Sequence, residues 1–171
     1  MEPLEILTYP NELLQRESEP VQQFDDELRQ FVRQLEITMD SGPGAVGIAA
    51  PQVGRNQRIV IVDVSGRKKI KHHGRLYLIN PEITEWDGLK VGREGCLSVP
   101  DYTGNVVRAE KIKLRAFDPH GNSQEFEMED YEARAVQHEI DHLDGLLFLD
   151  RLVSRRNDLF ARKVYQEKES K

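Results

Sequence analysis

The amino-acid sequence predicts an α+β domain in which mixed antiparallel sheets pack around a central helix. Apolar residues recur at helical spacing in two strong segments, and short β-branched or alternating runs typical of strands lie between them. Helices and strands do not alternate regularly, which argues against βαβ units. At 171 residues the chain has the length of one domain, and we expect residues 1–171 to form a single one.

The first predicted helix covers residues 25–39. Its apolar side chains recur every three or four positions, at Leu28, Phe31, Val32, Leu35 and Met39. Asp25 or Asp26 can cap its N-terminus, and the Gly- and Pro-rich residues 41–44 end it.

Three segments between the helices predict strands. Residues 59–62 are a β-branched run typical of a buried strand, and residues 76–79 form a second short apolar run. Residues 111–128 alternate in polarity on both sides of a turn at residues 118–121, which predicts a β-hairpin.

The second predicted helix, residues 130–143, does not place the usual solvent-facing residues opposite its apolar stripe. One stripe carries Ala133, Val136, Ile140 and Leu143, and the opposite side carries His138, His142, Tyr131 and Ala135. Because neither side suits solvent, we expect a central helix covered on both sides.

The composition excludes several classes of protein. The single cysteine excludes an intramolecular disulfide framework, and 38% hydrophobic with 32% charged residues is not the profile of a disordered chain. No apolar run approaches the roughly 20 residues that span a bilayer. A net charge of −6 argues against a general DNA-binding protein. We expect a soluble cytoplasmic protein.

The charge is unevenly distributed. Residues 151–171 carry seven Lys or Arg and three Asp or Glu, a net charge of +4, whereas the first 150 residues carry −10. Apolar Val153, Phe160 and Val164 in this segment predict a weakly amphipathic, basic C-terminal helical tail. Such a tail is either a solvated helix face or a docking element for an anionic partner.

Candidate metal-ligating and catalytic residues occur together in the H-E-x-x-H sequence of residues 138–142. On a helix His138 and His142 lie one turn apart on the same face, so both imidazoles can bind one metal ion. Glu139 between them can act as general base. An ordinary amphipathic helix with surface histidines would give the same five-residue match.

A catalytic site of this type needs a third protein ligand, and the lone cysteine is a candidate. Cys96 lies between Gly95 and Pro100, in a segment that favours a glycine-kinked strand or loop close to a site. The alternative is a small buried apolar residue. A thiolate with two imidazoles suits Zn²⁺ or Fe²⁺, and ligand type alone does not separate the two.

Three segments together resemble the peptide deformylase family. Residues 45–52, AVGIAAPQ, are close to the family's G-x-G-x-A-A-P-Q, residues 94–98 match E-G-C-L-S, and residues 137–142 match Q-H-E-x-D-H. Their order and spacing also fit, so the resemblance covers essentially the whole chain.

The resemblance implies a metal-dependent hydrolase of protein biosynthesis. It would remove the N-formyl group from the N-terminal formylmethionine of newly synthesised polypeptides and release formate. Cys96, His138 and His142 would be the metal ligands, with Fe²⁺ as the physiological ion and Zn²⁺ or Ni²⁺ able to substitute. Glu139 would move the protons.

The resemblance also implies how the substrate is held. The Gln52 amide and the Leu97 backbone N–H would stabilise the oxyanion, although Gln52 taken alone is also typical of a surface turn. Wheel position and proximity suggest Val46, Tyr131 and Ala135 as candidates for a methionine pocket, although each also fits the core. Gly47 and Gly95 would let the backbone approach an extended peptide.

One residue departs from the family pattern. Ala45 stands where the family has its first glycine, with Gly44 just before it. If that position requires a positive φ, Ala45 would be strained and the loop would take a shifted path.

Two other functions fit part of the sequence. An H-E-x-x-H endopeptidase would need a downstream His or Glu ligand, but no His follows His142, and Glu167 and Glu169 lie in the charged tail. The second alternative is a module that binds the ribosome or a polypeptide chain without catalysis. Such a module would not need the proposed metal ligands or the general base. In some family members a C-terminal helix docks on the ribosome, so the basic tail predicts a contact with ribosomal RNA.

Overall fold

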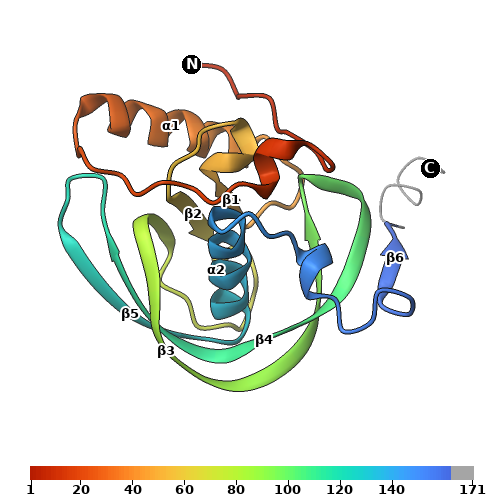
Figure 1. Ribbon diagram of the computed structural model, residues 1–171. Helices are drawn as coiled ribbons and strands as arrows, with labels where there is room; N and C mark the ends of the chain where they lie inside the picture. Colours follow the sequence, from red (N-terminus) through yellow and green to blue (C-terminus); the bar gives the residue numbers. More distant parts are fainter. Residues whose placement is uncertain (163–171) are drawn as a thin grey trace.

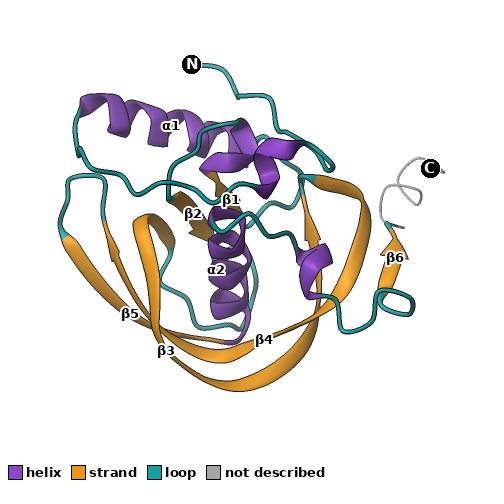
Figure 2. Cartoon of the chain, viewed as in Figure 1, coloured by secondary structure: helices purple, strands orange, loops and turns teal. Residues whose placement is uncertain are grey.

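A computed structural model of the chain describes residues 1–162, and in it a strongly curved sheet wraps around one helix (Figures 1 and 2). The helices are α1 (Asp26–Asp40) and α2 (Asp130–Leu143), with short 3-10 helices at Glu12–Gln15, Ala50–Val53 and Phe148–Arg151. The strands are β1 (Gly47–Ala49), β2 (Ile59–Asp63), β3 (Arg75–Cys96), β4 (Val99–Phe117), β5 (Ser123–Glu129) and β6 (Leu159–Ala161). The α+β prediction is confirmed.

The strands of the described chain form one hydrogen-bonded sheet in the order β1-β2-β3-β4-β5, and β6 pairs with β4. All of these pairings are antiparallel. The long strands β3 and β4 pair from Ile79↔Phe117 to Cys96↔Val99 and curve beneath α2 (Figure 1). Their tight connection at Leu97 and Ser98 therefore lies at the far end of the longest hairpin.

Helix α2 lies at the centre of the molecule, as its sequence predicts. All of its residues from Glu132 to Leu143 are buried except Gln137, which is half-buried. Ala133 and Val136 pack in one cluster with Val60, Leu78 and Leu114 of the sheet. Burial on both sides fixes the orientation of the helix, because it leaves no face free to rotate towards solvent.

Helix α1 packs against a second apolar cluster on the other side of β2. Its Leu35 lies in that cluster with Ile59 and Ile61, whereas the alternate residues Val60 and Val62 belong to the cluster around α2. A strand covered on both faces has no polar alternation, which explains the continuous apolar run of residues 59–62. The Asp25 side chain caps α1 by accepting a hydrogen bond from the Leu28 N–H at 3.0 Å.

The strand predicted at residues 76–79 is the first part of a much longer one. The sequence hides the rest of β3, because the pairing shifts register between Ile79 and Glu82 and again between Ile83 and Glu85. Asn80 and Gly88 also take positive φ angles, of 51° and 73°. These irregularities break the period-two pattern from which strands are predicted. The hairpin predicted at residues 111–128 is confirmed by the pairing of β4 with β5.

The predicted C-terminal helix is wrong for the described part of residues 151–171. After the 3-10 turn that ends at Arg151, the chain forms strand β6, which pairs with Tyr102–Gly104 of β4. Pairing satisfies the backbone groups at the open edge of β4, which an amphipathic helix would leave unpaired. The Phe160 ring lies beneath the Arg93 guanidinium, 4.0 Å from the ring centroid. Residues 163–171, which include Val164, lie outside the described residues.

None of the helices in residues 1–162 is both long and apolar enough to cross a lipid bilayer.

At Gly104 the C-terminal segment packs tightly on the sheet. A Cβ at this position would lie 2.3 Å from Leu152 Cδ2, 3.0 Å from the Asp158 carbonyl oxygen and 3.2 Å from Phe148 Cε1. We expect Gly104→Ala to lower the free energy of unfolding by about 1–3 kcal/mol, because the extra methyl overpacks the contact. Urea denaturation measures this change.

Gly66→Ala is the matched control, since a Cβ at Gly66 meets nothing within 4 Å. Its effect should stay within about 0.5 kcal/mol. Equal stability of the two variants would contradict the close packing of Phe148, Leu152 and Asp158 against Gly104.

Candidate metal centre

The two histidines of α2 face the same part of the sheet. His138 and His142 are both buried, and their ring centroids lie 5.1 Å apart in an edge-to-face arrangement. One helical turn separates them, so the spacing of residues 138 and 142 produces this geometry directly.

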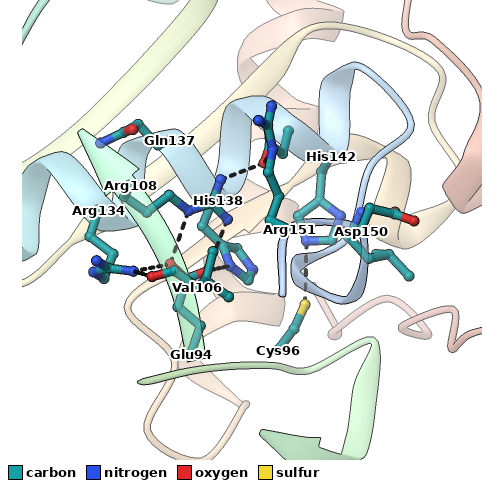
Figure 3. A network of polar contacts seen from close by, with 12 residues as sticks. Glu94, Cys96, Val106, Arg108, Arg134, Gln137, His138, His142, Asp150 and Arg151 are labelled. Atoms are coloured by element: carbon teal, nitrogen blue, oxygen red, sulfur yellow. Dashed lines mark hydrogen bonds and ion pairs between the residues drawn. The ribbon is translucent and has the colours of Figure 1, made fainter. Parts of the chain in front are cut away.

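Cys96 comes from the end of β3 and completes a group of three. Its Sγ lies 3.3 Å from Nε2 of His142, and Figure 3 shows the thiol directed at that ring. One ligand atom from each of Cys96, His138 and His142 lies within 4.8 Å of the others, and all three residues are buried. A compact thiolate–imidazole set of this kind fits a tetrahedral ion such as Zn²⁺ or Fe²⁺ with one open position.

The buried carboxylate of Glu94 is hydrogen-bonded to the ring of His138. Glu94 Oε1 lies 2.9 Å from Nδ1 of His138, and the side chain is 5% exposed. An acceptor at Nδ1 favours the tautomer that leaves Nε2 free to bind a metal. Burial would raise the pKa of Glu94, but the hydrogen bonds and charges of His138 and Arg108 hold it well below its ordinary value.

Two arginines compensate the charge of Glu94 (Figure 3). Arg108 donates to both carboxylate oxygens at 2.9 Å, and Nη1 of Arg134 donates to Oε2 at 2.7 Å. Arg108 also pairs with Asp141, the residue before His142. This network joins β3, β4 and α2 in one buried polar cluster.

Most of this network is not predicted by the sequence. Glu94 and Asp141 belong to the motifs already identified, so their position beside a ligand was the signal available. Arg108 and Arg134 carry no such signal, because nothing in a sequence distinguishes a buried arginine from a solvated one.

The acidic residue of the H-E-x-x-H sequence, Glu139, is buried. Glu139 Oε1 has no hydrogen-bond partner among the described residues. Burial, followed by the charge of Glu94, raises the pKa of Glu139 to about 7, although His138 and Arg108 oppose the shift. A carboxyl with a pKa near neutrality can both accept and return a proton.

The two imidazoles have different electrostatic environments. Burial disfavours the charged form of both, and it lowers the pKa of His142 well below its ordinary value. At His138 burial is outweighed by hydrogen bonding to Cys96 and Glu94 and by the charge of Glu139, so its pKa is raised.

Gly47 and Gln52, from the motif at residues 45–52, lie beside Glu139 and Cys96. A Cβ on Gly47 would lie 2.5 Å from Glu139 Oε2, so this position requires glycine for the close approach. The Gln52 Oε1 accepts from the Ala49 N–H at 2.9 Å, which turns its amide nitrogen towards Ser98 Oγ at 3.1 Å and Cys96 Sγ at 3.5 Å. Gln52 is 1% exposed, so it is not a surface turn residue.

A cavity of about 250 Å³ opens beside these groups. It is lined by Gln52, Cys96, Leu97, His138 and Glu139 and by the substrate-binding candidates Val46, Gly47, Gly95, Tyr131 and Ala135. The structure thus brings together every residue singled out from the sequence, with His142 just behind the lining through its contact with Cys96. A larger cavity, of about 790 Å³, borders Trp86 and Ile112 and includes none of the three clustered residues.

The expected strain at Ala45 is absent. Ala45 is not among the residues with a positive φ, whereas the preceding Gly44 has a φ of 68°. The left-handed conformation therefore falls on a glycine, and the loop accommodates Ala45.

Comparison with known proteins identifies relatives of similar length. A family model described as polypeptide deformylase matches residues 3–158. A peptide deformylase of Acidobacterium capsulatum is 42% identical over 159 residues, covering 93% of this chain and 92% of the relative. One from Alkalilimnicola ehrlichii is 44% identical over 161 residues, covering 94% of this chain and 88% of the relative.

Solved structures agree with this similarity. The crystal structure of a peptide deformylase from Legionella pneumophila matches with a TM-score of 0.82 at 40% identity, covering 90% of this chain and 89% of that one. A peptide deformylase from Acinetobacter baumannii with Met-Ala-Ser bound matches with a TM-score of 0.82 at 34% identity, covering 88% of this chain and 100% of that one.

The buried Glu94 network gives a prediction for stability. We expect Glu94→Gln to lower the free energy of unfolding by about 3–5 kcal/mol, because it leaves buried arginine charge uncompensated. Chemical denaturation measures the loss. Glu85→Gln is the control, since Glu85 is 67% exposed in its pair with Lys113, and it should cost less than about 1 kcal/mol. Similar losses in both variants would contradict the role given to Glu94.

Proposed function

Because the chain belongs to the peptide deformylase family, we propose that Cys96, His138 and His142 hold its catalytic metal ion. Members of this family are hydrolases that remove the formyl group from the N-terminal formylmethionine of newly synthesised polypeptides, and this is the reaction of the chain. The observation that carries the assignment is the convergence of one thiol and two imidazoles within 4.8 Å beside Glu139.

The donor set fits a divalent ion, and we propose Fe²⁺ as the physiological one. Zn²⁺ or Ni²⁺ would be accommodated by the same thiolate and imidazoles. When bound, such an ion acts as a Lewis acid that lowers the pKa of water and polarises the formyl oxygen. Glu94 supports the site by accepting from Nδ1 of His138, so that Nε2 keeps its lone pair for the ion.

Glu139 moves the protons of the reaction. Its unpartnered Oε1 can accept a proton from the attacking water as the new carbon–oxygen bond forms. The same carboxyl then gives that proton to the amine of methionine as the formyl carbon–nitrogen bond breaks, so formate and a free N-terminus leave. Its raised pKa, about 7, suits both steps.

Gln52 and Leu97 stabilise the oxyanion. The Gln52 amide nitrogen is held near Cys96 by the hydrogen bond between its Oε1 and the Ala49 N–H. Leu97 follows Cys96 in the turn between β3 and β4, and its backbone N–H supplies the second donor. Donors fixed in advance stabilise developing charge without a cost of reorganisation.

The cavity beside the metal site takes the N-terminal methionine. Val46, Tyr131 and Ala135 supply its apolar contacts, and the backbone at Gly47 and Gly95 lines the same cavity, where it can pair with an extended peptide. The related protein from Acinetobacter baumannii holds Met-Ala-Ser, a peptide of this kind.

Two alternatives from the sequence fit less well. An endopeptidase of the H-E-x-x-H type takes its third ligand downstream, whereas the third side chain here is the upstream Cys96. A binding module without turnover would not need a buried general base against Gly47.

We further propose a cytoplasmic location, in contact with the ribosome. Cys96 is a free, buried thiol, and its oxidation would remove a metal ligand, so a reducing compartment suits it. The proposed ribosomal contact uses the basic segment of residues 151–171, where Arg155 and Arg156 are exposed. Exposed arginines on an acidic protein favour a salt-sensitive contact with RNA phosphates.

Glu139→Gln tests the proposed reaction. It should reduce formate release from a formyl-Met peptide by about 10²–10⁴-fold while metal binding is retained, because the amide cannot accept a proton. Metal analysis of anaerobically purified protein, coupled to a formate assay, measures both. An unchanged rate would contradict the role of Glu139, and cleavage of an internal peptide bond without formate release would contradict the function.

Charge reversal tests the ribosomal contact. The double variant Arg155→Glu and Arg156→Glu should lose most of its cosedimentation with ribosomes at low salt and keep its activity on short peptides. Arg33→Glu, an exposed change on α1, is the control and should cosediment like the unmodified protein. Undiminished cosedimentation of the double variant would contradict the contact.

A further inference from the structure

Ser98 is a buried serine beside the candidate metal centre. It lies in the two-residue turn that joins Cys96 to its pairing partner Val99 at the end of the β3–β4 hairpin, and it is 0% exposed. Its Oγ lies 3.1 Å from Nε2 of Gln52, and the hydrogen bond between these two side chains is buried. No step of the proposed reaction uses this hydroxyl.

The carboxamide of Gln52 is held at both of its ends. Oε1 accepts from the Ala49 N–H at 2.9 Å, and one of the two N–H groups on Nε2 donates to Ser98 Oγ. The terminal torsion of a glutamine side chain is broad, so a contact at Oε1 alone would leave the amide plane free to turn. The contact with Ser98 removes this freedom.

The hydrogen bond to Ser98 also determines where the second N–H of the amide points. Nε2 lies 3.5 Å from Cys96 Sγ, so this N–H faces the thiol and the cavity beside it. An amide that turned about its terminal torsion would aim this N–H elsewhere. The orientation of the proposed oxyanion donor therefore depends on the Ser98 hydroxyl.

The N-terminal segment fixes the backbones of both residues. The Leu7 N–H donates to the Gln52 carbonyl oxygen at 2.7 Å, and the Tyr9 N–H donates to the Ser98 carbonyl oxygen at 2.8 Å. One short segment thus sets the distance between the turn that carries Ser98 and the turn that carries Gln52. The acceptor that Ser98 offers is in place before a substrate binds.

We propose that Ser98 is a positioning residue that orients the Gln52 amide for stabilisation of the oxyanion. This inference rests on the proposed function of the site. A donor stabilises developing charge best when its orientation is fixed in advance. Because Ser98 acts through Gln52 and on the transition state, its removal should change kcat more than KM.

Ser98→Ala tests the proposal with formyl-Met-Ala-Ser as substrate. We expect kcat for formate release to fall by about three- to tenfold, the effect of one lost hydrogen bond, while KM changes by less than about twofold. The amide is still present in this variant, so the loss is smaller than that of removing the donor itself. Expressing kcat per bound metal ion cancels any partial loss of folded protein.

Gln52→Ala separates positioning from a general structural effect. Removing the donor should lower kcat by about 10²–10³-fold. In this background Ser98→Ala should change kcat by less than about twofold, because the hydroxyl no longer has an amide to orient. A purely structural role would give the same fold-loss with and without the Gln52 amide.

Ser18→Ala is the matched control. Ser18 is also buried, at 4% exposed, and its Oγ has no hydrogen-bond partner among the described residues. It is not part of the cavity lining. The substitution therefore removes a buried hydroxyl that orients no group of the site, and kcat and KM should match those of the unmodified protein.

Two results would overturn the inference. One is a Ser98→Ala variant with the kcat of the unmodified protein, and the other is an equal fold-loss in the presence and absence of the Gln52 amide. Either result leaves the proposed function intact. An unchanged kcat in Gln52→Ala contradicts the oxyanion role proposed for Gln52, and an unmodified protein that releases no formate contradicts the proposed function, so this inference fails in both cases.

Discussion

The buried pairing of Glu94 with arginine is the interaction on which the candidate site depends. Glu94 accepts from Arg108 and Arg134 and lies 2.9 Å from Nδ1 of His138, so one carboxylate links β3, β4 and α2. A buried ionic cluster is a poor source of net stability, because its desolvation offsets much of its attraction. It does fix geometry, because any shift of α2 along the sheet would leave a charge unpaired.

The curved sheet and the central helix together bring the residues of the candidate site close to one another. Side chains from three distant segments must converge on one small site beside this helix. The long strands β3 and β4 curve beneath α2, and their tight turn delivers Cys96 to His142 (Figures 1 and 3). The first motif reaches the site from β1, where Gly47 leaves room for the carboxyl of Glu139.

The described part of the C-terminal segment packs on the sheet and reaches the cavity, and its amino-acid composition does not predict either contact. By charge alone, residues 151–171 are a basic segment of an otherwise acidic protein. In the structure its described part adds strand β6 to β4, places Phe160 beneath Arg93 and lays Arg162 on Gly95. Among the cationic side chains of its described part, Arg155 and Arg156 are exposed, Arg151 pairs with Asp141, and Arg162 lies at the edge of the cavity beside Cys96.

The sequence alone determined both helices, strand β2, the hairpin of β4 with β5 and the three residues of the candidate metal cluster. Each has a local signal, such as the apolar spacing of α2 or the four-residue separation of His138 and His142. Tertiary structure decided the length of β3, the positive φ at Gly44 in place of Ala45, and the strand at Leu159–Ala161. It also decided the burial of Arg108 and Arg134. These features depend on contacts between residues that are far apart in the sequence. A local sequence pattern does not show which distant strand edge or charged side chain a segment will contact.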